Sequence, residues 1–285
     1  MKEKKLSRSA EIWRRYRKSP TAMIGLVIIG VILLAAIFAD LIVPYEYGTK
    51  QVISDRLQGP SLKHPFGTDD LGRDLFARVI HGSRSSLALG IATTAIATVI
   101  GGFLGGVCAY YGNRVDNIIM RLLDVITSIP TTLLSLSIVA ALGAGISNLI
   151  IAITVSRVPT FARVIRSAVL NIVNQEYIEA ARAGGSGNLR IMLRHVYPNA
   201  MSPIIVQCTM SVSQLILQAA GLSFLGMGVQ PPAPEWGALL SGGRAYIRSA
   251  GYLCVIPGLA VMLTVLALNL LGDGLRDALD PKLKK

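Results

Sequence analysis

Residues 85–111 read SSLALGIATTAIATVIGGFLGGVCAYY and contain no Asp, Glu, Lys or Arg. A helix needs about 20 mostly apolar residues to cross the hydrocarbon core of a membrane, and this run is longer than that. Residues 22–39 and 249–272 are also free of charge over a comparable length. These three runs predict three membrane-spanning helices, so lipid is the expected solvent of the apolar surface.

The composition of the whole chain agrees with a membrane protein. Of its 285 residues, 52% are hydrophobic and only 15% are charged, whereas soluble globular proteins average about 25% charged residues. So few charges exclude a disordered chain, a coiled coil and most water-soluble enzymes. The three cysteines, Cys108, Cys208 and Cys254, lie in apolar stretches, at spacings that indicate neither a metal site nor a disulfide framework.

The remaining apolar sequence supplies three more spans. Residues 125–156 are uncharged but too long for one crossing, and Gly143-Ala144-Gly145 in their middle predicts a tight turn. We therefore expect a third span from about residue 118 to these glycines and a fourth over about residues 146–162. A fifth is expected over about residues 201–225. The predicted fold class is an all-α membrane protein with six transmembrane helices.

The distribution of basic residues predicts the orientation. Six spans place both termini on one side, and most of the 28 Lys and Arg residues lie in the segments of that side, which the positive-inside rule makes cytoplasmic. The expected organisation is a cytoplasmic basic tail (1–20), a first span (21–43), an extracytoplasmic loop (44–84), a core of five spans (85–272) with a cytoplasmic loop (163–199), and a cytoplasmic tail (273–285).

The net charge of +12 is explained by this topology and by attraction of the amino-terminal tail to membrane lipid. No nucleic-acid partner is expected, because no platform of aromatic and basic residues accompanies the charges.

The motifs of several kinds of chemistry are absent from the sequence. It contains no Gly-x-x-x-x-Gly-Lys-Ser/Thr loop, so the chain is not expected to hydrolyse ATP by itself. It contains neither His-Glu-x-x-His nor Gly-x-Ser-x-Gly, and its three histidines, His64, His81 and His195, fall on opposite sides of the predicted membrane. We expect no catalytic residues, no metal and no cofactor bound by this chain.

The cytoplasmic loop 163–199 carries helix signals of its own. Asn174 is expected to cap a short helix that runs to Ala183 and is ended by the glycines of residues 184–187. A second short helix is expected from Leu189 to Tyr197, with Pro198 terminating or kinking it before the fifth span. The predicted product is a helix-turn-helix elbow whose small residues let a partner approach closely.

The elbow sequence resembles a known motif. Glu179-Ala180-Ala181, followed by Gly185 and Pro198, is similar to the EAA loop of ABC-type importer permeases, although the family's Ile-x-Leu-Pro ending is replaced here by His195-Val196-Tyr197-Pro198. The resemblance implies that this loop couples the chain to an ATPase subunit. The residues implied in that coupling are Glu176, Glu179, Ala180, Ala181, Gly185 and Pro198.

Further stretches resemble one subgroup of these permeases, the second (C-type) subunit of dipeptide, oligopeptide and nickel importers. They are Phe66-Gly67-Thr68-Asp69-Asp70-Leu71-Gly72-Arg73-Asp74, then Gly112-Asn113-Arg114-Val115-Asp116, then residues 224–237 and 272–281. The resemblance implies the type I importer fold, a location in a bacterial or archaeal inner membrane, and a heterodimer with a second permease. It also implies two cytoplasmic ATPases that hold ATP and Mg, and an extracytoplasmic substrate-binding protein.

The implied activity is inward transport of dipeptides or oligopeptides. Nickel or a nickel chelate is the alternative cargo, and an ion-driven secondary transporter or a membrane scaffold is the alternative of another class. A secondary transporter normally shows acidic coupling residues near the membrane midplane, whereas the only acidic residues in the predicted spans are Asp40 and Asp124, both near span ends.

Four polar features have more than one interpretation. In the 66–74 stretch, Gly67, Asp69, Asp70 and Gly72 suit a turn that ties down its own backbone, and with Arg73 and Asp74 they also suit contact with a substrate-binding protein. Arg121 and Asp124 are spaced to pair on one helix turn and are expected to fix a helix end rather than to bind cargo. Glu235-Trp236 suits the membrane interface, although a structural role is the preferred interpretation. Arg157, inside the fourth span, either snorkels to the headgroups or lines a pathway that meets a peptide carboxylate.

Overall fold

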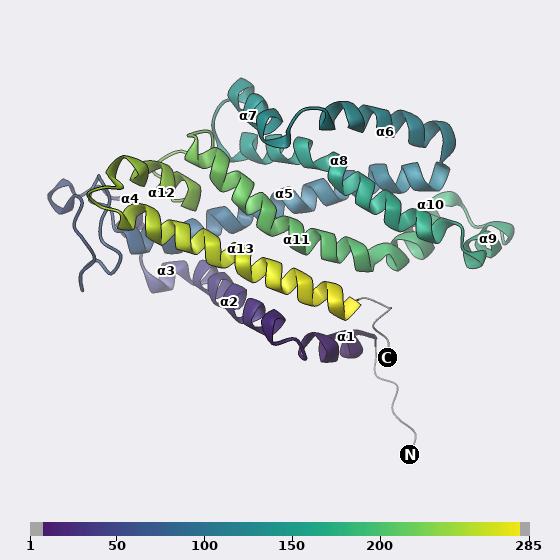
Figure 1. The fold of residues 1–285 in the computed structure, drawn as a ribbon, viewed down its shortest axis with the longest axis horizontal. Coiled ribbons are helices and arrows are strands. Elements are labelled where there is room, and N and C mark those ends of the chain that lie inside the picture. The colour runs from purple at the N-terminus through teal and green to yellow at the C-terminus, as the bar shows by residue number, and fades with distance from the viewer. Residues whose placement is uncertain (1–7, 280–285) are drawn as a thin grey trace, which may run out of the picture.

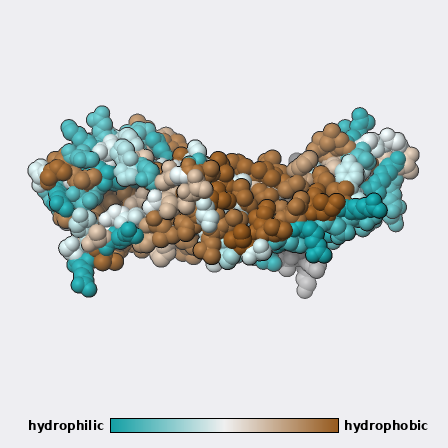
Figure 2. Space-filling model, turned by 90° about the horizontal axis from the view of Figure 1, so that it is seen from above, coloured by the Kyte–Doolittle hydropathy of each residue, from teal (hydrophilic) through white to brown (hydrophobic). Residues whose placement is uncertain are grey.

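The computed structural model describes residues 8–279, and within them every regular element is helical. Five helices are long and apolar enough to cross a membrane, and they lie side by side along the long axis of the molecule (Figure 1). They are α2 (Pro20–Ile37), α5 (Leu75–Tyr111), α8 (Ile146–Val173), α11 (Tyr197–Phe224) and α13 (Tyr252–Leu279). Figure 2 shows a hydrophobic middle between two hydrophilic ends. The prediction of an all-α membrane protein is confirmed.

The predicted third span is a bent pair of helices. α6 (Asn113–Thr127) and α7 (Thr131–Leu142) together pass the test for a span, but they meet at an angle of 80°. The break falls before Pro130, which is consistent with the steric clash that keeps a residue preceding proline out of the helical region. The described chain therefore has five long helices, and six crossings if the bent pair counts as one.

The carboxylates of Asp116 and Asp124 on α6 both pair with arginines of α8. The predicted pairing of Arg121 with Asp124 is wrong, because Asp124 accepts a hydrogen bond from Arg163 Nη2 at 2.8 Å. Asp116 likewise accepts from Arg166 Nε at 2.6 Å. Both arginines lie on α8, so these two ion pairs fasten α6 to α8 rather than stabilising α6 alone.

The glycine turn between the third and fourth spans is confirmed. α7 ends at Leu142 and α8 begins at Ile146. Gly143 and Gly145 between them have φ angles of 92° and 154°, a region that residues other than glycine rarely adopt.

Small residues also allow α5 and α8 to pack closely. A Cβ at Gly101 or Gly105 of α5 would overlap α8.

One end of the molecule, the loop end, is formed by residues that precede α5 and α13. It holds α3 (Ala39–Ile42), α4 (Tyr45–Thr49), the 3-10 helix η1 (Ile53–Asp55), α12 (Trp236–Gly243) and the 3-10 helix η3 (Arg244–Tyr246). α2 stops at Ile37, earlier than the end of the predicted first span, and α5 begins at Leu75, within the predicted loop 44–84. The part of this connection that follows α3, residues 44–74, is here called the capping loop.

Glu235 and Trp236 have a structural role, which is the interpretation preferred from the sequence, rather than a place at the membrane interface. Both are almost fully buried at the loop end. The Glu235 carboxylate accepts hydrogen bonds from the backbone N–H groups of Gly237 and Ala238 and so caps α12, and Trp236 Nε1 donates to the carbonyl of Val79. Their role is to attach α12 to α5.

The opposite end, the elbow end, holds α1 (Arg8–Tyr16), α9 (Glu176–Ala183), α10 (Asn188–Ile191) and the π-helix η2 (Met192–Val196). Tyr16 donates a hydrogen bond to the carbonyl of Ala22 and packs with Ala278 of α13. The first and last described helices therefore meet, on the same half of the molecule as α9 and α10 (Figure 1). That this end is cytoplasmic stays a prediction.

Candidate functional site

The first candidate site is the elbow, residues 174–198, which joins the end of α8 to the start of α11. Ile178 of α9, Ile191 of α10 and Val196 of η2 are completely buried. They pack in one cluster with Val169 of α8 and Tyr110 of α5. Burying an aliphatic side chain of this size is worth about 1.5–3 kcal/mol, so apolar contacts attach the elbow to three long helices.

The elbow differs from the prediction in its helix boundaries. Asn174 follows the end of α8 and does not cap α9, whose N-cap is Gln175 with no side-chain hydrogen bond. α8 itself continues eleven residues past the predicted end of the fourth span, from 162 to Val173. The glycines do end α9, since Gly184 follows its last residue.

Pro198 neither terminates nor breaks the second helix. α10, η2 and α11 form one continuous helical stretch, Asn188–Phe224. In its π-turn the N–H of Tyr197 bonds to the carbonyl of Met192, five residues earlier. Proline has no N–H to donate, and a wider turn just before it is one way for a helix to accommodate that loss without ending.

Most predicted coupling residues lie on the surface of the elbow. Glu176, Glu179, Ala180 and Gly185 are exposed, and Gly185 has a φ of 77°. Pro198 is exposed in the first turn of α11, and Ala181 is partly buried against the apolar cluster. The geometry thus presents small residues and two carboxylates outward over a buried anchor.

Sequence reasoning missed Tyr110, which lies at the end of α5. Its hydroxyl donates to Asn188 Oδ1 at 2.9 Å, and the guanidinium of Arg182 lies 5.0 Å from its ring centroid. One aromatic side chain therefore touches both short helices of the elbow. A lone tyrosine at the end of an apolar run carries no sequence signal for such a contact.

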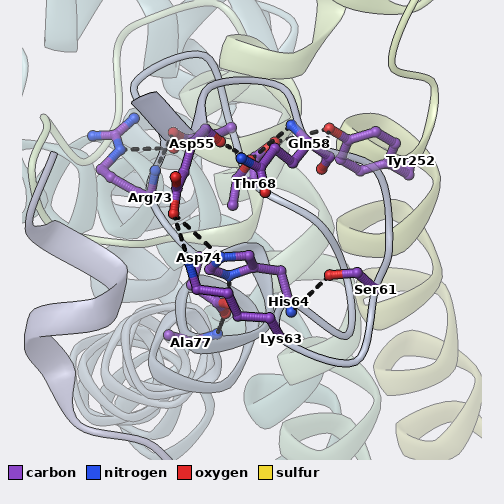
Figure 3. Close-up of polar contacts among 11 residues, drawn as sticks. Asp55, Gln58, Ser61, Lys63, His64, Thr68, Arg73, Asp74, Ala77 and Tyr252 are labelled. Carbon is purple, nitrogen blue, oxygen red and sulfur yellow. Dashed lines mark hydrogen bonds and ion pairs between the residues drawn. The ribbon is translucent and has the colours of Figure 1, made fainter. Parts of the chain in front are cut away.

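The second candidate site is the capping loop, whose polar contacts are drawn in Figure 3. Asp69 accepts hydrogen bonds from the N–H groups of Leu71 and Arg73 and from Arg73 Nε at 2.7 Å. Asp74 caps α5 through the N–H of Ala77 and lies 2.8 Å from His64 Nδ1. The prediction that this stretch ties down its own backbone is confirmed.

More distant parts of the chain also hold the capping loop. The hydroxyl of Tyr252, at the start of α13, donates to the carbonyls of Gln58 and Thr68 at 2.9 Å (Figure 3). Gly67 and Gly72 have φ angles of 81° and 73°. A Cβ at Gly72 would overlap the carbonyl oxygen of Val52, so the loop requires glycine there.

Burial limits what the capping loop can offer to a partner. The side chains of Asp69, Arg73 and Asp74 are at least nine-tenths buried, whereas Asp70 is about one-third exposed. On the surface of the loop, Lys63 bonds Asp55 at 2.9 Å and lowers the pKa of that carboxyl below its usual value. Contact with a substrate-binding protein stays a prediction that these contacts do not test.

The third candidate site is a cavity of about 610 Å³ between α7, α8 and α11. Arg157 lines it and donates from Nε to Gln218 Oε1 at 2.9 Å. Arg157 therefore faces an open cavity between these three helices and bonds α11. The described residues contain no group of three or more His, Cys, Asp or Glu side chains that could hold a metal ion.

Two known protein families match this chain. Residues 81–285 match the family described as "binding-protein-dependent transport system inner membrane component". Residues 7–60 match the "N-terminal TM domain of oligopeptide transport permease C". Together the two matches cover nearly the whole chain.

Individual relatives are similar over almost their full length. The chain is 46% identical to a dipeptide transport system permease protein of Alkalihalophilus pseudofirmus, over 96% of this chain and 90% of that protein. It is also 46% identical to a glutathione transport system permease protein of Escherichia coli, over 96% of this chain and 90% of that protein. A di/tripeptide transport system permease protein of Pseudomonas aeruginosa is 44% identical, over 96% of this chain and 92% of that one.

Among solved structures, the chain resembles one from the MetNI methionine ABC transporter in inward-facing conformations. The TM-score is 0.57 at 23% sequence identity, and the match covers 72% of this chain and 98% of that one. At this identity the likeness shows the fold, which is that of a type I ABC importer permease.

Proposed function

This chain belongs to the family of binding-protein-dependent transport system inner membrane components, and from that premise we propose that it conducts dipeptides or oligopeptides into the cell as one permease subunit of an ATP-driven importer. The observation that carries the proposal is the 46% identity to a dipeptide permease over 96% of the chain. The names of the other two relatives also refer to peptides, since glutathione is a tripeptide. These names favour peptide over nickel, and a binding-protein-dependent family argues against an ion-driven secondary transporter.

The proposal assigns a partner to each part of the molecule. Two cytoplasmic ATPases bind ATP and Mg and hydrolyse the nucleotide, because the sequence of this chain has no phosphate-binding loop. A second permease completes the pathway as a heterodimer, and an extracytoplasmic binding protein delivers cargo at the loop end. The elbow end and both termini then face the cytoplasm of a bacterial or archaeal cell.

The elbow is proposed to receive the motion of one ATPase. Glu176, Glu179, Ala180, Ala181 and Gly185 form the receiving surface, and Pro198 joins it to α11. The buried anchor beneath that surface touches α5, α8 and α11, so displacement of the elbow is passed to three helices together. Two of them, α8 and α11, line the Arg157 cavity, which connects ATPase closure to the proposed pathway.

Reconstitution of the full complex tests this function. The two permeases and two ATPases are placed in nanodiscs with the binding protein, and ATP hydrolysis is measured with alanine peptides of two to five residues and, separately, with nickel. We expect a peptide to stimulate hydrolysis and to be imported in proteoliposomes. Stimulation by nickel alone, or uptake that follows an ion gradient without ATP, would contradict the proposal.

A further inference from the structure

Arg157 lies well inside α8, a helix long and apolar enough to cross a membrane. It is the twelfth of the 28 residues of α8. At a rise of about 1.5 Å per residue, it lies about 17 Å from the first residue of the helix, Ile146. The hydrocarbon core is about 30 Å thick. The side chain faces the cavity between α7, α8 and α11, so its charge is directed toward that cavity.

The charge of Arg157 has no acidic partner within the described residues. Its one hydrogen bond there is from Nε to the carbonyl oxygen of Gln218, and no ion pair joins it to a carboxylate. A charged side chain at the membrane centre is costly, and such residues mark substrate pathways when they face a cavity. The fold therefore leaves a positive charge whose anion must come from outside this chain.

Gln218 fixes the direction in which this charge points. Its amide nitrogen donates to the hydroxyl of Ser135 at 3.1 Å, and that hydroxyl lies 2.9 Å from the hydroxyl of Ser156. Gln218, Ser135 and Ser156 are all buried. With its nitrogen held by Ser135, the amide turns its oxygen to Arg157 Nε, and the three helices are linked through side chains.

The remaining donors of Arg157 suit a carboxylate. A guanidinium has five N–H donors in a planar fork, and only Nε of Arg157 is bonded in the described structure. The two terminal nitrogens match the spacing of the two oxygens of a carboxylate, which arginine binds in a bidentate manner. Gln214 and Thr132 add polar groups to the cavity wall, and Leu133, Leu136 and Leu217 make the rest apolar.

We infer that Arg157, oriented by Gln218, binds the C-terminal carboxylate of the peptide during its passage through the membrane. This inference rests on the proposed function and names the chemical group that the pathway recognises. Every unmodified linear peptide ends in such a carboxylate whatever its side chains, so one arginine serves a varied cargo. Gln218 and Ser135 act as positioning residues.

The test compares uptake of one peptide in two forms. The full complex is reconstituted in proteoliposomes, and uptake of trialanine and of its C-terminal amide is measured with both at concentrations that saturate the binding protein. Each variant is scored by the ratio of the two rates, so that the preference of the binding protein, common to all samples, cancels. In the unaltered complex we expect the free peptide to be favoured.

Three variants give distinct expectations. Arg157→Gln should lower the ratio about tenfold, the effect of losing one charge-assisted bond of about 1.4 kcal/mol. Gln218→Glu should lower it similarly, because the new carboxylate occupies the guanidinium from within the chain. Arg163→Gln is the control, since it removes the same charge from the same helix where Asp124, outside the cavity, is the partner, and it should leave the ratio unchanged.

Two outcomes would overturn the inference. If Arg157→Gln and Gln218→Glu slow both peptides equally in assembled complexes, Arg157 is structural and does not read the carboxylate. If Arg157→Gln prevents assembly with the second permease, as tested by size-exclusion chromatography, its anion is a carboxylate of that subunit. Failure of the unaltered complex to import either peptide would instead reject the proposed function, so the two failures are distinguishable.

Discussion

The two polar ends of this molecule are stabilised by different interactions. At the loop end, charged side chains turn inward and bond the backbone, as Asp69, Asp74 and Glu235 do. At the elbow end, three aliphatic side chains anchor two short helices, and the charged residues Glu176 and Glu179 point outward. Directional bonds define one shape, whereas apolar contacts tolerate small displacements. The comparison indicates that the loop end is rigid and that the elbow end can move.

The largest expected effect is on the rigid end. Gly72→Ala places a Cβ on the carbonyl of Val52 at a φ of 73°, so the capping loop must rearrange. We expect a loss on the order of 4 kcal/mol of unfolding free energy and a strong fall in folded yield, measured by size-exclusion chromatography and thermal unfolding in detergent. Gly59→Ala in the same loop is the matched control, because nothing lies within 4 Å of its Cβ. Equal behaviour of the two variants would show that the loop is not rigid.

The second prediction concerns the anchor of the elbow. Ile178→Ala removes a fully buried side chain and should cost about 3 kcal/mol, most of it as local loosening of α9 and α10. Hydrogen exchange of residues 176–196 should rise while that of the capping loop stays constant. Peptide-stimulated uptake should fall more than ATPase attachment, because the exposed docking surface remains.

The control for the anchor is an exposed aliphatic residue of the same elbow. Leu189 is 71% exposed, so Leu189→Ala should leave the exchange of α9 and α10 nearly unchanged. If Ile178→Ala loosened the capping loop as well, the two ends would form one cooperative unit and the proposed division would be wrong.

Whether a feature could be predicted from the sequence depends on how far apart in the chain its contacting residues are. The apolar runs, the 143–145 turn and the two-helix elbow depend on neighbouring residues, and all three were predicted. The bonds from Asp124 to Arg163 and from Arg157 to Gln218 join residues far apart in the chain, and no local pattern reports them. The burial of Glu235 escaped prediction for the same reason, since its hydroxyl donor, Ser86, lies on α5.

A smaller effect is expected where α5 meets the elbow. Tyr110→Phe removes the hydrogen bond to Asn188 but keeps the ring beneath Arg182, so it should cost about 1 kcal/mol. Hydrogen exchange should rise about fivefold at the start of α10 and little in α9. Tyr110→Leu also removes the aromatic face and should increase exchange in both helices. Identical exchange in the two variants would show that the Arg182 contact adds nothing.

The smallest expected effect is a difference between the two ends in how their hydrogen exchange responds to acid. Lys63 lowers the pKa of Asp55, and a carboxyl whose pKa falls on folding stabilises the folded state at neutral pH and loses that contribution as the pH falls through the lowered value. The capping loop should therefore loosen slightly in acid. The elbow anchor is apolar and carries no such pair, so its exchange, corrected for the intrinsic rate, should not change. His64 Nε2 lies 3.6 Å from the carboxylate of Asp55, so His64 is left unchanged in every variant that is compared.

Asp55→Asn isolates the titrating group in this last comparison. The asparagine keeps the size of the side chain but has no proton to gain, so exchange of residues 53–66 in this variant should be less sensitive to acid than in the unaltered chain. Because Asp55 is near the surface, solvent screens the pair and the difference should be small. If the capping loop loosened equally in both chains, the surface pair of Lys63 and Asp55 would contribute nothing to the rigidity of this end.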